Sequence, residues 1–159
     1  MRLDRVAARQ GAKSFSWLLY RVQQDSNFWI RYRASELLRD SSRSVVLEDH
    51  LVQRQEIEML KREASTESHP DLRARLVGSL LNLTAKEPWA RTWFESLLRS
   101  ERSAYYRAEL LGAALRVWAD DELVAQLERI SVDEPGKEDA YATGRNHARN
   151  ILLKLGYSH

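Results

Sequence analysis

The sequence contains no cysteine, and only three of its 159 residues are proline and six are glycine. Without cysteine the chain has neither disulfides nor thiolate ligands for a metal ion. A chain built from short strands needs proline and glycine turns at close intervals, which this composition does not supply. Leucine, alanine, arginine and glutamate, which favour helix, are abundant. The composition therefore predicts an all-α protein.

Long apolar runs and an excess of one charge are also missing. No stretch approaches the roughly 18 apolar residues that a membrane span requires. The first six residues, Met1 to Val6, carry charges where a signal peptide needs an apolar core. We therefore expect a cytoplasmic protein without a membrane partner. The formal net charge is only +2, so the strongly basic surface typical of nucleic-acid binding is not indicated.

An arginine recurs four times in similar surroundings, at spacings of 34 to 42 residues. Small or apolar residues follow it at the third, sixth and seventh positions, which share one face of a helix. An acidic residue precedes each arginine by six positions. This recurrence indicates an internal repeat. The acid and arginine pairs are Asp25 and Arg31, Glu67 and Arg73, Glu101 and Arg107, and Asp139 and Arg145.

These pairs resemble the second half of the HEAT repeat, in which an acid precedes a Val-Arg pair on the inner helix. The resemblance covers nearly the whole chain, although Gly144 and Ser79 depart from the usual apolar pattern. It implies a single domain, residues 1–159, folded as a right-handed α-α superhelix of about four antiparallel helix pairs. The pairs would span about 14–40, 45–84, 88–118 and 120–155, with residues 1–13 either an N-terminal cap or disordered.

The outer helix of each pair is expected just before the acid, at residues 14–24, 45–64, 88–99 and 120–131. Pro88 suits the first turn of the third outer helix, and Asp120 is a good N-cap for the fourth. The segment 133–139 carries four acidic residues together with Pro135 and Gly136. It is therefore predicted to be a solvated loop.

The recurrent arginines could be interpreted as a row that binds phosphate groups. Their acids recur with them, however, and in HEAT-like proteins such ladders satisfy the backbone of turns and join neighbouring repeats. We therefore interpret the four acids and the four arginines as a structural ladder.

A partner-binding groove is predicted on the concave face of the inner helices. In the two central copies, the side opposite the expected core carries small and apolar residues, which would form a shallow trough for an amphipathic helix or extended peptide. The alternative is that the chain itself or a homodimer buries this face. The trough residues are Ala74, Gly78, Leu81, Ala108, Gly112 and Leu115, with Arg33, Arg75 and His147 at the rim.

Five tryptophans are many for a chain of this length. Trp17, Trp29 and Trp118 are expected in the core. Trp89 and Trp93 lie one turn apart on one helix face, and at least one of them is a candidate aromatic anchor for a partner.

The residues that support catalysis do not form a recognisable constellation. The four histidines lack the spacing of metal ligands, and neither a cysteine nucleophile nor a glycine-rich phosphate loop occurs. We therefore expect a non-enzymatic protein-interaction module or adaptor without cofactors, of a size that also fits an inhibitor or immunity-type protein. The alternatives are a nucleic-acid-binding HEAT-like protein, similar to the alkylpurine DNA glycosylases, or a HEAT-like bilin lyase or chaperone subunit.

Overall fold

The computed structural model describes residues 3, 5, 11–49, 51–132 and 140–157, and every regular element among them is a helix. The all-α prediction is thereby confirmed. The chain divides into two compact units, Met1–Thr84 and Ala85–His159, and each is considered by itself; the single-domain organisation stays a prediction. Most of the expected N-terminal cap and the whole of the expected loop at 133–139 lie outside the described residues.

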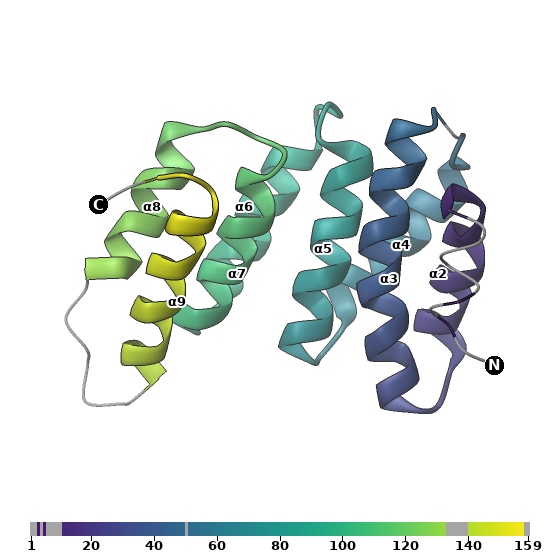
Figure 1. Ribbon diagram of the computed structural model, residues 1–159, viewed down its shortest axis with the longest axis horizontal. Helices are drawn as coiled ribbons and strands as arrows, with labels where there is room; N and C mark the ends of the chain where they lie inside the picture. Colours follow the sequence, from purple (N-terminus) through teal and green to yellow (C-terminus); the bar gives the residue numbers. More distant parts are fainter. Residues whose placement is uncertain (1–2, 4, 6–10, 50, 133–139, 158–159) are drawn as a thin grey trace. The chain divides into compact units, whose positions relative to one another are not determined.

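The first unit holds a short 3-10 helix, η1 (Gly11–Ser14), followed by α2 (Phe15–Gln24), α3 (Phe28–Leu47), α4 (Arg54–Thr66) and α5 (Pro70–Thr84). In Figure 1, α3 lies between α2 and α5, and α4 lies behind α3 and α5. The α5 helix is buried around most of its circumference, since nine of its fifteen residues are buried. A helix that is apolar on most sides needs such surroundings.

The second unit holds α6 (Ala90–Ser100), α7 (Ala104–Leu115), α8 (Asp121–Val132) and α9 (Ala140–Lys154). The α9 helix packs against both α7 and α8. Trp118, just beyond α7, joins the two ends of the α6–α7 segment. Its Nε1 donates to the carbonyl oxygen of Ala85 at 3.0 Å, and its ring lies edge-on to Phe94 with the centroids 5.7 Å apart. Trp118 is half-buried there.

Three of the four expected outer helices begin and end within two residues of α2, α6 and α8. The expected helix at 45–64 is wrong, because α3 continues to Leu47 and α4 begins only at Arg54. The apolar spacing continues through Val45, but Val45 packs as the last buried residue of α3. The chain then turns through Asp49, whose φ of 50° is left-handed. Glu56 closes the start of α4 by accepting the N–H of Gln53 at 3.3 Å.

Gly144 departs from the HEAT-like pattern for a reason that the structure supplies. A Cβ atom at this position would lie 2.8 Å from the Cβ of Ala104 and 2.9 Å from the backbone nitrogen of Tyr105. The side of α9 that carries Gly144 therefore meets the first turn of α7 at backbone distance. A larger residue fits only if the two helices separate.

We expect Gly144→Ala to lower the free energy of unfolding by about 1 to 3 kcal/mol, because the added methyl group meets backbone rather than a movable side chain. Urea denaturation followed by circular dichroism measures the change. Asn146→Ala, at an exposed position of the same helix, is the matched control and should change the free energy by less than about 0.5 kcal/mol. Equal stability of Gly144→Ala and the wild type would contradict the close approach of α7 and α9.

Asp120 caps α8, as the sequence predicted. Its Oδ1 accepts the N–H groups of Glu122 at 2.8 Å and Leu123 at 3.2 Å, while its Oδ2 accepts from Nη1 of Arg91 at 2.7 Å. The hydrogen bond from Arg91 and those from the two backbone N–H groups hold the pKa of Asp120 below its ordinary value of 3.8. Because the folded state depresses this pKa, the stabilisation is complete above the unfolded pKa and is lost as the pH falls through the folded pKa.

Asp120→Ala should therefore cost about 1 to 2 kcal/mol of stability at pH 7, mainly through the lost cap. Asp120→Asn, which can still accept the two backbone N–H groups, should cost less than about 1 kcal/mol. Chemical denaturation at pH 7 and again below pH ~3 tests both values. The difference between wild type and Asp120→Ala should shrink at the lower pH, and a difference independent of pH would count against the charged cap.

Candidate functional site

The ladder acids close the turns that precede α3, α5 and α7. Asp25 accepts the N–H of Asn27 at 2.8 Å, Glu67 that of His69 at 3.1 Å, and Glu101 that of Ser103 at 3.0 Å. Each acid thus binds the backbone two residues further on, just before α3, α5 and α7 begin. The fourth acid, Asp139, lies outside the described residues.

One ladder arginine links two successive helix pairs of the first unit. Arg31 on α3 forms an ion pair with Glu67, which ends α4, and its Nε donates to the carbonyl oxygen of Val22 at 2.8 Å. Only 6% of the Glu67 side chain is exposed. Glu63 lies beside this ion pair, and its pKa is raised above the ordinary value. Burial is the largest cause; the charge of Arg31 opposes it, and the charge of Glu67 adds to it. The remaining ladder arginines, Arg73, Arg107 and Arg145, are half-buried.

The expected apolar trough is not an open surface. All six of its residues are buried, with Leu81 and Ala108 fully so and Leu115 the most exposed at 8%. In the second unit the reason is direct, because a Cβ atom at Gly112 would lie 3.0 Å from Cγ2 of Ile151 on α9. The prediction of an exposed trough is therefore wrong at Ala74, Gly78, Leu81, Ala108, Gly112 and Leu115. A helical wheel places the buried residues of α5 and α7 on one side, whereas both helices are buried on several sides.

Two of the three expected rim residues join neighbouring inner helices within their own units. The guanidinium of Arg75 on α5 lies 4.4 Å from the ring centroid of Tyr32 on α3, and its Nη2 lies 3.4 Å from Oε1 of Glu36. His147 on α9 repeats this arrangement on α7. Its ring stacks on that of Tyr105 with the centroids 4.1 Å apart, and its Nε2 contacts a carboxylate oxygen of Glu109.

Arg75 and His147 each follow their ladder arginine by two residues. Both side chains are about four-fifths buried. They are therefore equivalent positions that hold two inner helices together, and their role at a groove rim is not supported. The third rim residue, Arg33, is exposed and pairs with Glu36 at 2.8 Å.

The long helix α3 carries a row of side chains, exposed except for the half-buried Glu36, that the sequence interpretation missed. Trp29, expected in the core, is 73% exposed, and Leu47 near the other end is 86% exposed. Between them lie two ion pairs, Arg33 with Glu36 and Asp40 with Arg43 at 3.9 Å. We refer to this row as the α3 stripe: Trp29, Arg33, Glu36, Asp40, Arg43 and Leu47.

Trp29 is exposed because it stands in the first turn of α3, where Asn27 caps the helix by accepting the N–H of Trp29 at 2.9 Å. The cap fixes the side of the helix on which the indole projects. The spacing of the stripe by three and four residues is the signal that could have revealed it. It was hidden because the outer helix was expected to begin at Val45, which placed Leu47 on a different element.

The candidate anchors at the start of α6, Trp89 just before it and Trp93 in its first turn, are less exposed than Trp29. Trp89 and Trp93 are half-buried and lie edge to face, with ring centroids 6.4 Å apart. Trp17 on α2 is also half-buried, and Arg21 lies 5.4 Å above its ring.

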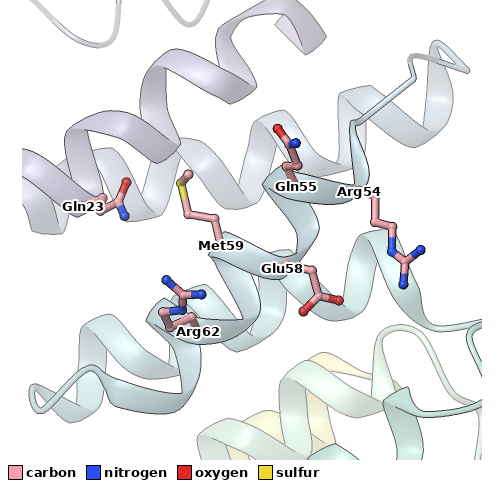
Figure 2. A pocket seen from close by; sticks show the side chains of 6 residues that line it. All are labelled: Gln23, Arg54, Gln55, Glu58, Met59 and Arg62. Atoms are coloured by element: carbon pink, nitrogen blue, oxygen red, sulfur yellow. The ribbon is translucent and has the colours of Figure 1, made fainter.

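A shallow hollow of about 520 Å³ lies between the end of α2 and α4, and Figure 2 shows the side chains that line it. Met59 points towards α2 there, and the polar side chains stand along α4. The lining combines opposite charges and amides without a histidine, serine or threonine, so it supplies no nucleophile paired with a base. The lining residues are Gln23, Arg54, Gln55, Glu58, Met59 and Arg62.

Across the described part of the chain, no group of three or more histidine, aspartate or glutamate side chains is placed to hold a metal ion. Over the same residues, no helix combines the length and apolarity needed to cross a membrane. No family model, curated protein or solved structure matches the chain. The α3 stripe is therefore the candidate site.

The buried pair of Arg31 and Glu67 makes a stability test of the ladder. We expect Glu67→Gln and Arg31→Met each to lower the free energy of unfolding by about 2 kcal/mol or more, because each leaves the other charge without its partner. The double variant should lose less than the sum of the two. Denaturant titrations of all four proteins give the coupling energy. As a control, Glu95→Gln removes a more exposed ion pair with Arg91 and should cost less than about 0.5 kcal/mol. If the effects of Glu67→Gln and Arg31→Met are additive, the two residues are not coupled.

Proposed function

We propose that this chain is a non-enzymatic protein-interaction module of HEAT-like architecture, acting in the cytoplasm. Its helices would form a right-handed superhelix of four antiparallel pairs. Two observations support this architecture: the same acid-closed turn precedes α3, α5 and α7, and Arg31 pairs with Glu67 of the next helix pair. The binding surface in this proposal is the α3 stripe.

The exposure of Trp29 carries the proposal. An indole that is 73% exposed on a capped, well-formed helix leaves a large apolar surface in water. Tryptophan is enriched among the residues that contribute most to protein–protein affinity. Leu47 and the neighbouring Val46 and Leu51, all more than half exposed, place a second apolar patch at the other end of α3. A solvated helix face is ordinarily polar along its length.

The charges of the stripe favour a protein partner over a nucleic acid. Arg33 and Arg43 are balanced by Glu36 and Asp40, with which they already form ion pairs. Binding to a phosphate backbone gains its affinity from an excess of cations that displaces counterions. A balanced row flanked by apolar side chains instead matches the mixture of apolar and polar contacts in protein interfaces.

We expect Trp29→Ala to reduce partner binding by about tenfold or more, since truncating an interface tryptophan commonly costs about 2 kcal/mol or more. Immobilised protein is used to capture binders from extracts of the cells that carry the gene, and captured proteins are quantified by mass spectrometry. Tyr20→Ala, at a 59% exposed aromatic on α2, is the matched control and should capture as the wild type does. Circular dichroism and melting should be unchanged in both variants. Equal capture by Trp29→Ala and the wild type would exclude the stripe as the binding surface.

A further inference from the structure

The α3 stripe is symmetric about the middle of its helix. At roughly 100° per residue, its six side chains lie within about 40° of a single line along α3. Its ends are apolar, and its charges run in the order plus, minus, minus, plus. Trp29 and Leu47 lie nine residues to either side of Leu38, Arg33 and Arg43 five, and Glu36 and Asp40 two.

We propose that the α3 stripe binds the α3 stripe of a second copy of this chain, with the two helices antiparallel around a twofold axis that lies level with Leu38 along α3, on the side opposite the buried Leu38 side chain. This rests on the proposed function and names the partner of the same surface. In a twofold interface every contact occurs twice, because a residue i that meets residue j of the other copy implies that j also meets i of that copy. Trp29 therefore faces Leu47 of the second copy, and Leu47 faces its Trp29, which covers both exposed apolar ends at once.

The charges in the middle of the stripe are complementary in this arrangement. Arg33 of one copy and Asp40 of the other lie on the same side of the interface, three residues apart along the axis, or roughly 4.5 Å. Glu36 and Arg43 of the other copy lie on the opposite side with the same separation. The two arginines that share an axial level lie on opposite sides, where they do not meet. Glu36 already lies between Arg33 and Arg75, so we assign the larger contribution to Arg33 and Asp40.

The size of the stripe limits the area that the dimer can bury. Trp29 and Leu47 are 18 residues apart, or about 27 Å along the helix. A pairing of two single helices of this length falls at the low end of specific interfaces, below about 1,200 Å² in total. The dimer is therefore expected to dissociate at micromolar rather than nanomolar concentrations.

Sedimentation of the full chain between roughly 1 µM and 1 mM tests the proposal. The mass should rise from that of an 18.5 kDa monomer towards twice this value. Leu47→Arg, at an 86% exposed position where folding is not disturbed, should weaken the dimer by at least about thirtyfold. Leu153→Arg, at a 66% exposed leucine on α9, is the matched control and should sediment like the wild type.

A charge swap tests the antiparallel register. Arg33→Glu and Asp40→Arg should each weaken the homodimer by about tenfold, because each places two like charges together across the interface. An equimolar mixture of the two variants should associate nearly as tightly as the wild type, since the mixed dimer restores both opposite-charge contacts. A parallel dimer would not show this rescue.

A wild type that stays monomeric throughout would overturn the inference, as would a dimer that Leu47→Arg does not weaken or a mixture that shows no rescue. If the monomeric chain still captures another protein through Trp29, the stripe is an interaction surface whose occupant is not a second copy. If it captures nothing and does not self-associate, the proposed function fails as well.

Discussion

The structure of the first unit depends on carboxylates that accept backbone N–H groups in the turns between successive helices. The acid that follows α2 or α4 accepts an N–H group two residues further on, which fixes the direction in which α3 or α5 begins. At Glu67 the same carboxylate also holds Arg31 of the preceding pair. One side chain therefore sets a turn and the spacing of two helix pairs. Its near-complete burial makes the loss of either partner costly, because a buried charge without its counter-ion cannot be solvated.

Once α3 and α5 are held in this way, their facing sides are joined by polar as well as apolar contacts. Arg75 reaches across to Glu36 and Tyr32, and the side-chain amide of Asn82 donates to Oγ of Ser42 at 2.9 Å. The second unit uses His147, Glu109 and Tyr105 in the equivalent place. These contacts explain why residues that a helical wheel places on a free face are in fact interior. The side of α3 that stays exposed is the one that carries the α3 stripe.

The sequence predicted helix type and most helix boundaries, because caps and turns are local. Asp120 and the ladder acids act on backbone within three residues of themselves. The exposure of Trp29 was missed although the three- and four-residue spacing of the stripe could have indicated it, because Leu47 was assigned to a different helix. The burial of Gly112 could not be predicted locally, since Ile151, which covers it, lies 39 residues further along the chain. The length of α3 was missed for a local reason, since the break after Leu47 is made by one left-handed residue, Asp49, without glycine or proline.

The charges in the middle of the α3 stripe help to explain how the chain tolerates exposed apolar side chains at both ends of it. Within one copy, Arg33 pairs with Glu36 and Asp40 pairs with Arg43, so each charge in the middle of the stripe has a partner while the chain is alone. Pairing with a second stripe would exchange water for opposite charges at little net gain, because exposed ion pairs contribute weakly. The affinity would then come from the two apolar ends and the orientation from the charges. A surface of this kind favours a reversible contact over a permanent one, since neither contribution alone is large.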